Sequence, residues 1–331
     1  MLARRALLAT LLATPAHAQP SPKRVVAEAT PKSVVAEATP KSVVAEATPK
    51  SVVASFSILA DMIQRVGESR VTVKSLAGPD QDLHSYEPRP SDIQAVAQAD
   101  IMAINGLGLE GWADRIAAAA GFKGTAIVAS KGIPALKSAQ KHVPGHPPGQ
   151  AHAHGAFDPH AWQDVANARR YVANIRDGLI AADPANTAAT TEAAARYTAE
   201  LTALDAEIRA LLGPIPRARR RAVTSHEAFA YFADAYDLDM LAITGTWRDA
   251  EPSARDLAAL AAQIKRQNIR ALFLENTSPP ASLRALASET KTTIGGRLYS
   301  DALSPPTGPA GSYIALMRHN ARTIAAALAD G

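Results

Sequence analysis

Four residues spread along most of the chain have side chains that could bind one metal ion: His84, His160, His226 and Asp301. Each lies in a short polar block of the kind that follows a β-strand. Three neutral imidazoles and one carboxylate are ligands that a borderline divalent cation such as zinc takes in a closed, four-coordinate site. The sequence contains no cysteine, which excludes thiolate ligands and disulfides. It therefore predicts one metal site, provided that the fold brings these side chains together.

The first residues of the chain predict export. The segment 1–18 begins with Arg4 and Arg5, continues with an apolar run over residues 6–13, and ends in the small-residue cleavage pattern Ala-His-Ala. This is typical of a secretory signal peptide. No later segment has the roughly eighteen unbroken apolar residues of a membrane span. We therefore expect a soluble periplasmic protein, and the arginine pair leaves the twin-arginine route open beside ordinary secretion.

A nine-residue repeat follows the leader over residues 22–48, with the copies PKRVVAEAT, PKSVVAEAT and PKSVVAEAT. A fourth copy starts at Pro49 and continues as PKSVVASFSILADM, which predicts the first strand and helix of the globular part. Units this short, each punctuated by proline, offer too little apolar surface for a core of their own. We interpret residues 19–51 as a flexible tether.

The charge of the globular part is close to zero. The formal net charge of the chain is +4, of which Arg4 and Arg5 contribute 2. Residues 19–51 contribute another 2, from five Lys/Arg against three Glu. The near-zero charge of the globular part gives no reason to expect a nucleic-acid partner. The arginine cluster at 217–221 is interpreted as a solvated loop.

Alternating strands and helices predict an α/β fold with mostly parallel sheets. The expected strands are 71–76, 101–104, 125–128, 222–225, 271–274 and 292–294, and the expected helices include 91–98, 253–267 and 280–290. In open sheets of this kind, ligands collect beyond the carboxyl ends of the strands. Two lobes that face each other could therefore supply two metal ligands each.

One long helix, residues 184–212, is predicted to join the lobes. Asp183 is placed to cap its first turn, Pro184 suits the first helical position, and no Gly or Pro interrupts it. Apolar residues at helical spacing predict a stripe packed against protein: Tyr197, Leu201, Leu204, Ile208 and Leu211. At 1.5 Å per residue the helix would be about 40 Å long. It divides the chain into an amino lobe, 52–183, and a carboxyl lobe, 213–331.

Over residues 52–331 the chain resembles the zinc and manganese solute-binding proteins of ATP-binding cassette importers. The matching blocks are SFSILADM, LHSYEPRPSD, DPHAWQD, SHEAFAYFADAY, EPS, LFLE, RLYSDAL and GSYIALMRHN. The resemblance implies two lobes joined by one rigid helix, a metal held in the cleft between them, and delivery to a membrane permease. It also implies a monomer and leaves room for a periplasmic metallochaperone as a second partner. His84, His160, His226 and Asp301 fall on the family's ligand positions.

The third ligand position bears on the metal. Family members that favour manganese often have a carboxylate where this chain has His226, whereas zinc-favouring members have a histidine. Imidazole suits zinc and an oxygen-rich set suits manganese. We therefore predict Zn²⁺, with Mn²⁺ as the alternative. Zinc affinity should fall as the pH drops through the usual histidine range near 6.5, because the ligands must be neutral.

Further histidines and acids allow two interpretations each. The proline- and glycine-rich segment 142–154 carries four histidines: His142, His146, His152 and His154. It is either a mobile loop that captures zinc weakly or a plain polar loop. Glu227 and Glu275 either orient ligand imidazoles and offset charge, or are ordinary surface and strand-end acids.

A zinc hydrolase is the competing hypothesis. Catalytic zinc sites usually have three protein ligands and keep a fourth position for water, whereas four protein ligands leave none. His226-Glu227 begins like a metalloprotease helix, but that motif needs histidine at position 230, which is alanine. We therefore expect no enzyme, while a surface adhesin built on the same fold remains open.

Overall fold

The computed structural model describes residues 48–138, 156–246 and 253–329. The predicted signal peptide, nearly all of the tether and the histidine-rich loop 142–154 lie outside these residues. Within them, no helix combines the length and the apolar character that crossing a membrane requires.

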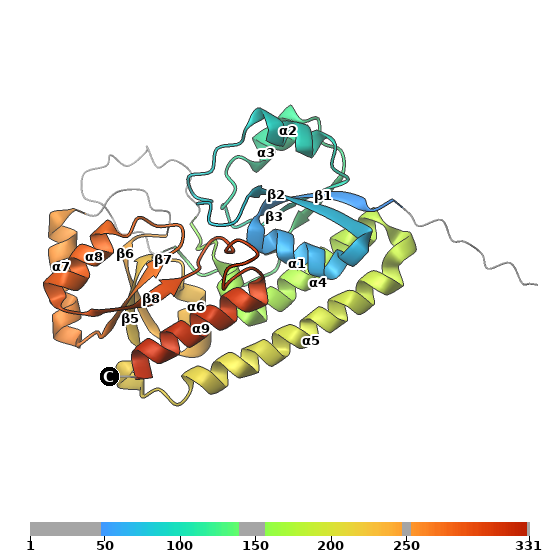
Figure 1. Ribbon diagram of the computed structural model, residues 1–331. Helices are drawn as coiled ribbons and strands as arrows, with labels where there is room; N and C mark the ends of the chain where they lie inside the picture. Colours follow the sequence, from blue (N-terminus) through green and yellow to red (C-terminus); the bar gives the residue numbers. More distant parts are fainter. Residues whose placement is uncertain (1–47, 139–155, 247–252, 330–331) are drawn as a thin grey trace, which may run out of the picture. The chain divides into compact units, whose positions relative to one another are not determined.

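Two four-stranded parallel sheets form the centres of the two lobes (Figure 1). The amino-lobe sheet has the order β2-β1-β3-β4 and the carboxyl-lobe sheet the order β6-β5-β7-β8. Their bounds are β1 Lys50–Phe56, β2 Val71–Ala77, β3 Ile101–Ile104, β4 Thr125–Val128, β5 Arg221–His226, β6 Asp239–Thr244, β7 Ala271–Glu275 and β8 Thr293–Leu298. The predicted α/β class, with a mostly parallel sheet in each lobe, is confirmed.

Nine α-helices flank these sheets in the described residues. They are α1 Ser57–Gly67, α2 Pro90–Ala97, α3 Ala113–Ala119, α4 Val165–Ala182, α5 Thr187–Leu212, α6 Ala230–Tyr236, α7 Ala254–Gln267, α8 Ala281–Thr290 and α9 Tyr313–Ala329. Sequence analysis did not predict α3, α4, α6 or the edge strand β6. Three of these four are short, and β6 is only partly buried. In such segments periodicity carries little signal.

Strand β1 is central in its sheet and is buried on both faces. Val52 and Ala54 belong to a core that includes residues of α1, α4 and α5, whereas Val53 packs with residues of α2 and α3 on the opposite face. This alternation is the two-residue period of a strand. Because both faces are covered, the run VVASF is apolar almost throughout rather than alternating with polar residues.

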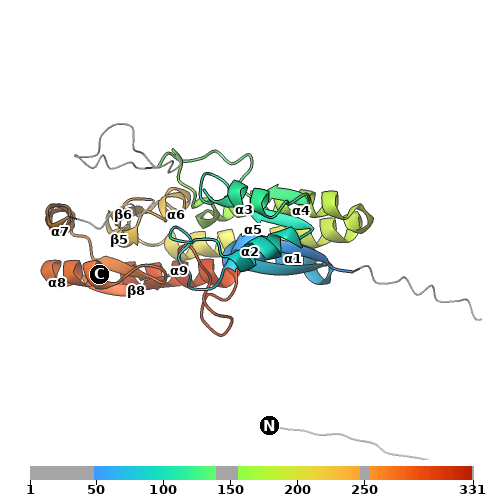
Figure 2. The same cartoon turned by 90° about the horizontal axis from the view of Figure 1, so that it is seen from above.

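The two lobes share one hydrophobic core. The largest buried cluster contains Phe56 of the amino-lobe sheet and Phe273 of the carboxyl-lobe sheet. Helix α5 runs along both lobes (Figures 1 and 2) and contacts α1, α4, α6 and α9. Opening the lobes widely would expose part of this core to water, which is unfavourable in proportion to the apolar area exposed. The fold therefore favours small motions between them.

Helix α5 differs from the prediction at its start and in its buried stripe, whereas its end at Leu212 is as predicted. Residues Pro184–Asn186 form a 3₁₀ turn, in which Asn186 N donates to Asp183 O at 3.2 Å, and the α-helix begins only at Thr187. The expected place of Leu211 in the buried stripe is wrong, because it is 36% exposed while Leu212 is 1% exposed. Steps of three and four residues both satisfy helical spacing, so the pattern could not choose between these neighbours.

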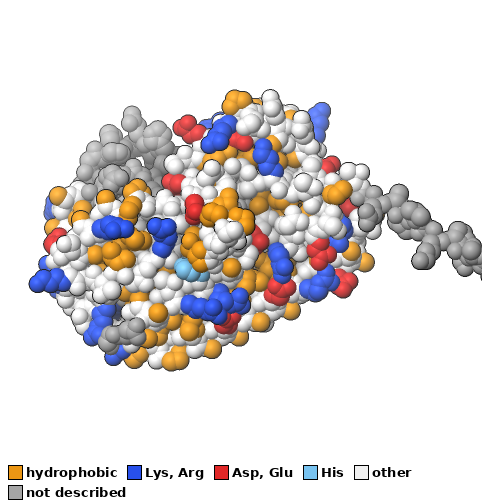
Figure 3. Space-filling model, in the orientation of Figure 1, with side chains coloured by type: hydrophobic (Ala, Val, Ile, Leu, Met, Phe, Trp, Pro, Cys, Tyr) orange, Lys and Arg blue, Asp and Glu red, His pale blue; other side chains and the backbone are white. Residues whose placement is uncertain are grey.

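The surface carries mixed charges. Lysine and arginine side chains lie among aspartate and glutamate side chains on the face shown in Figure 3. In the arginine cluster, Arg217 and Arg220 both pair with Asp237, and Arg221 pairs with Asp239 at 3.3 Å. These pairs leave less net positive charge than the sequence cluster suggests.

Replacing a buried and an exposed leucine of α5 should separate core packing from helix propensity. Leu201 is fully buried, so we expect Leu201→Ala to lower the free energy of unfolding by about 2–5 kcal/mol. Leu211→Ala, on the same helix, should change it by less than about 1 kcal/mol. Urea unfolding followed by circular dichroism measures both. Equal losses would contradict the assignment of the buried face.

Candidate metal centre

Four side chains from different parts of the chain meet at the carboxyl ends of the two sheets. His84 follows β2, and His160 directly precedes a 3₁₀ turn at Ala161–Gln163. His226 is the last residue of β5, and Asp301 lies three residues beyond the end of β8. One nitrogen or carboxylate oxygen from each residue lies within 4.8 Å of all the others. All four side chains are buried, with exposures of 0–4%.

The distances between these atoms fit one small cation. His84 Nε2 lies 3.2 Å from His160 Nε2, and the Asp301 carboxylate lies 3.8, 3.4 and 3.3 Å from Nε2 of His84, His160 and His226. Ligand atoms placed tetrahedrally about 2.0 Å from one centre are separated by about 3.3 Å. The cluster therefore has the dimensions of a four-coordinate site.

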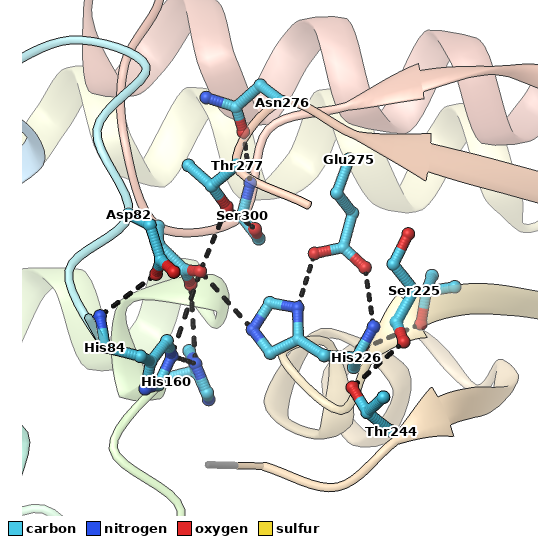
Figure 4. Close-up of polar contacts among 12 residues, drawn as sticks. Asp82, His84, His160, Ser225, His226, Thr244, Glu275, Asn276, Thr277 and Ser300 are labelled. Carbon is cyan, nitrogen blue, oxygen red and sulfur yellow. Dashed lines mark hydrogen bonds and ion pairs between the residues drawn. The ribbon is translucent and has the colours of Figure 1, made fainter. Parts of the chain in front are cut away.

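Two of the imidazoles have their outer nitrogens fixed by carboxylates. His160 Nδ1 lies 2.7 Å from Asp158 Oδ1, and His226 Nδ1 lies 2.6 Å from Glu275 Oε2. A carboxylate only accepts, so each Nδ1 donates its hydrogen to it, and whenever the ring is neutral its Nε2 lone pair faces the cluster. Figure 4 shows the His226 ring with Glu275 on its outer side and the other histidines on its inner side.

His84 and His160 are each held by the same kind of turn. Asp82 Oδ1 accepts from His84 N at 3.0 Å, and Asp158 Oδ1 accepts from His160 N at 2.9 Å. Both are turns in which an aspartate side chain binds the amide two residues ahead. Sequence analysis missed the role of Asp158, although the repeated Asp-x-His spacing was a signal for it.

The two acids considered from the sequence have different neighbours. Besides contacting the His226 ring, Glu275 accepts a hydrogen bond from His226 N at 2.9 Å and is 3% exposed. Glu227 accepts from Thr246 Oγ1 at 3.1 Å, and Thr246 is outside the four-residue cluster. Among the tryptophans, Trp162 packs its ring 5.3 Å from that of His160, while Trp247 lies outside the described residues.

Buried carboxylates raise the pKa of His160. Burial by itself lowers this pKa, but the carboxylates of Asp158 and Asp301 outweigh burial and raise it from 6.5 to about 9. In the metal-free chain His160 is therefore protonated at neutral pH. A cation entering the cluster must displace that proton, which moves the expected pH dependence of binding above the histidine range near 6.5.

Comparisons with known proteins agree on the family and differ on the metal. The family model described as "Zinc-uptake complex component A periplasmic" matches residues 52–327. The manganese-binding lipoprotein MntA of Halalkalibacterium halodurans is 31% identical over 276 residues, covering 83% of this chain and 87% of the relative. The iron-binding protein YfeA of Yersinia pestis is 30% identical over 271 residues, covering 82% and 84%.

The fold also matches a solved structure. The periplasmic zinc-binding protein TroA from Treponema pallidum has a TM-score of 0.75 and 30% sequence identity, and the match covers 85% of this chain and 99% of that one. A protein of similar fold is thus named for zinc, and relatives of similar sequence are named for manganese and iron.

The stability of the metal-free protein should depend on the His160 proton. Its folded pKa of about 9 exceeds the unfolded value of 6.5, so its stabilising contribution is complete below pH 6.5 and is lost as the pH rises through 9. The contribution is at most roughly 3 kcal/mol. Asp158→Asn keeps an acceptor oxygen for the turn but removes the charge, and should flatten this dependence. Thermal unfolding in chelator between pH 6 and about 9.5 tests this, and parallel curves for variant and wild type would contradict it.

Proposed function

The chain belongs to the family of periplasmic zinc-uptake components, the metal-binding proteins of ATP-binding cassette importers, and on this premise we propose that it captures zinc in the periplasm and delivers it to its permease. Members of this family are transport components and not enzymes. The observation that carries the proposal is the convergence of three imidazole nitrogens and one carboxylate at tetrahedral distances.

The donor set favours zinc over manganese. Relatives with this fold are named for several metals, so the choice has to be argued from the ligand atoms. Manganese prefers an oxygen-rich, octahedral set, whereas His84, His160, His226 and Asp301 offer three nitrogens and one carboxylate. Manganese remains the alternative cargo.

The surrounding charges also suit a divalent cation. A bound Zn²⁺, three neutral imidazoles and the single negative charge of Asp301 would together have a net charge of +1. Asp158 and Glu275 stand behind two of the imidazoles and offset this charge, and by accepting the Nδ1–H protons they raise the basicity of the metal-facing nitrogens. Glu275 thereby takes the orienting role that was one of its two interpretations.

Zinc capture depends on displacing a proton, and zinc release depends on how tightly the lobes are packed together. Zinc binding displaces the His160 proton, so affinity should rise with pH up to about 9. The shared core restrains the lobes, so the permease must separate the ligands by a small displacement. The same proposal includes export by the signal peptide, a flexible tether and a metallochaperone as a second partner. It also gives loop 142–154 a weak zinc-capturing role.

A hydrolase fits the centre poorly. Four protein ligands leave no coordination position for an activated water. Helix α6 begins at Ala230, where a metalloprotease helix starting at His226 would need its second histidine.

Binding of one zinc ion per molecule tests the proposal. His226→Ala and Asp301→Ala should each weaken zinc binding at least about a hundredfold, because each removes a direct ligand. His319→Ala is the matched control, since His319 Nε2 contacts Arg297 O at 2.9 Å and lies outside the cluster. Calorimetry and elemental analysis give affinity and stoichiometry. Displacement of zinc by manganese at comparable concentration would overturn the metal assignment.

Deleting residues 142–154 should leave one tightly bound zinc, because the four clustered ligands lie outside this loop. Only weakly bound zinc should be lost. Elemental analysis after dialysis against a weak chelator measures the difference. If the tight site disappeared with the loop, the separation into one tight site and one auxiliary segment would be wrong.

A further inference from the structure

The peptide carbonyl directly before Asp301 is held by two side chains of the opposite lobe. Trp162 Nε1 donates to Ser300 O at 2.9 Å, and Gln163 Nε2 donates to the same oxygen at 2.8 Å. Trp162, Gln163 and Ser300 are fully buried. The two donors belong to the 3₁₀ turn that starts immediately after His160.

These two bonds fix the orientation of one peptide group. The Ser300 carbonyl can only accept, so the amide nitrogen of Gln163, and not its oxygen, must face it. Two donors on one carbonyl hold the peptide plane between Ser300 and Asp301 and hence the direction in which Asp301 projects its side chain. We propose that Gln163 and Trp162 are positioning residues that aim the Asp301 carboxylate at the metal. This inference rests on the proposed function.

The amino lobe also holds the other side of this segment. Leu303 N donates to Ser57 Oγ at 3.0 Å, and Asp80 N donates to Leu303 O at 2.9 Å. Asp301 therefore lies between two attachments to the lobe that also carries His84 and His160. Although its sequence position puts Asp301 in the carboxyl lobe, the backbone on both sides of it is bonded to the amino lobe as well as to Asn276 of the carboxyl lobe, whose Nδ2 donates to Ala302 O at 3.2 Å.

Side chains of the carboxyl lobe contact the residues around Ser300. The Ser300 carbonyl itself is bound by Trp162 and Gln163, the pair that we call the clamp. Asn320 accepts from Tyr299 N at 2.9 Å and donates to Tyr299 O at 2.7 Å, which fixes the preceding peptide groups. Thr277 Oγ1 reaches Asp301 Oδ2 at 3.3 Å, and Asn276 Oδ1 accepts from Ser300 N at 3.4 Å. These last two bonds are long, whereas the Trp162 and Gln163 bonds have ordinary lengths.

The clamp couples two metal ligands that come from different lobes. His160 lies two and three residues before Trp162 and Gln163, and its Nε2 is 3.4 Å from Asp301 Oδ1. The turn that carries one ligand thus sets the position of the other before any ion arrives. Such pre-organisation raises affinity because the ion does not have to order its ligands, and outer contacts of this kind typically change metal affinity about 10–100-fold.

The test removes one donor at a time, with little change in volume for Gln163→Met and a smaller ring for Trp162→Phe. Gln163→Met loses the amide and Trp162→Phe loses the indole N–H, while the Ser300 carbonyl keeps its other donor. Each variant should raise the Kd for zinc about tenfold, and the absorption spectrum of the cobalt-substituted protein should differ from wild type because the carboxylate is misaligned.

A control variant separates positioning from general stability. Asn174 donates its amide to the backbone carbonyls of Ala129 and Lys131 at 2.7 and 2.9 Å, all within the amino lobe. Asn174→Leu should lower the Tm by a similar amount and leave zinc affinity and the cobalt spectrum unchanged. If Gln163→Met and Trp162→Phe behave like Asn174→Leu in all three measurements, the positioning role is wrong.

A second measurement is independent of the cargo. Crystal structures of metal-free Gln163→Met and Trp162→Phe should show the Asp301 carboxylate displaced from His160. A carboxylate that stays at its wild-type position in both variants would overturn the inference. Failure of the wild-type protein to bind zinc would instead overturn the proposed function, and these structures would still decide the role of the clamp.

Discussion

The burial of carboxylates against histidines is the constraint on which the centre depends. Asp158, Glu275 and Asp301 are 1–3% exposed, and a carboxylate in such surroundings is strongly destabilising unless a positive charge or hydrogen-bond donors compensate it. Asp158 and Glu275 accept hydrogen bonds from Nδ1 of His160 and His226, and Asp301 faces the Nε2 atoms. In the metal-free chain a proton on His160 supplies compensating charge, and a divalent cation can take over that role.

The same constraint limits how the molecule can open. Separating the lobes would break the buried contacts of Asp301 and expose apolar residues of both lobes, such as Phe56 and Phe273. Both effects oppose a wide hinge motion. The hydrogen bond that Leu303 N donates to Ser57 and the one that Leu303 O accepts from Asp80 N add to this, because they join the Asp301 segment to the amino lobe. Hydrogen bonds therefore cross the boundary that the sequence defines between the two lobes.

Local pattern was enough for most of the strands, although not for the edge strand β6, and it singled out the four clustered residues by type. The apolar runs 101–104 and 125–128 match β3, which is largely buried, and β4, of which only Ile127 is buried. His84, His160, His226 and Asp301 stood out because their residue types suit one metal, and the family resemblance placed them together. What the sequence could not give depends on three-dimensional neighbours. Leu211 and Leu212 have the same helical spacing, and only packing decides that Leu212 is buried. The Trp162 and Gln163 bonds to Ser300 join residues more than 130 positions apart, which no local pattern indicates.

Metal choice in this architecture has to reside in a few side chains. The fold matches a zinc-binding protein with a TM-score of 0.75, and relatives of about 30% identity are named for manganese and iron. Since relatives of similar overall sequence are named for different metals, overall similarity does not identify the ion. Selection then depends on the ligand atoms and on the groups that fix them. In this chain His226 is held by Glu275 through both its ring and its backbone amide. That double contact leaves the Nε2 lone pair of His226 directed into the cluster, the arrangement on which the proposed zinc site depends.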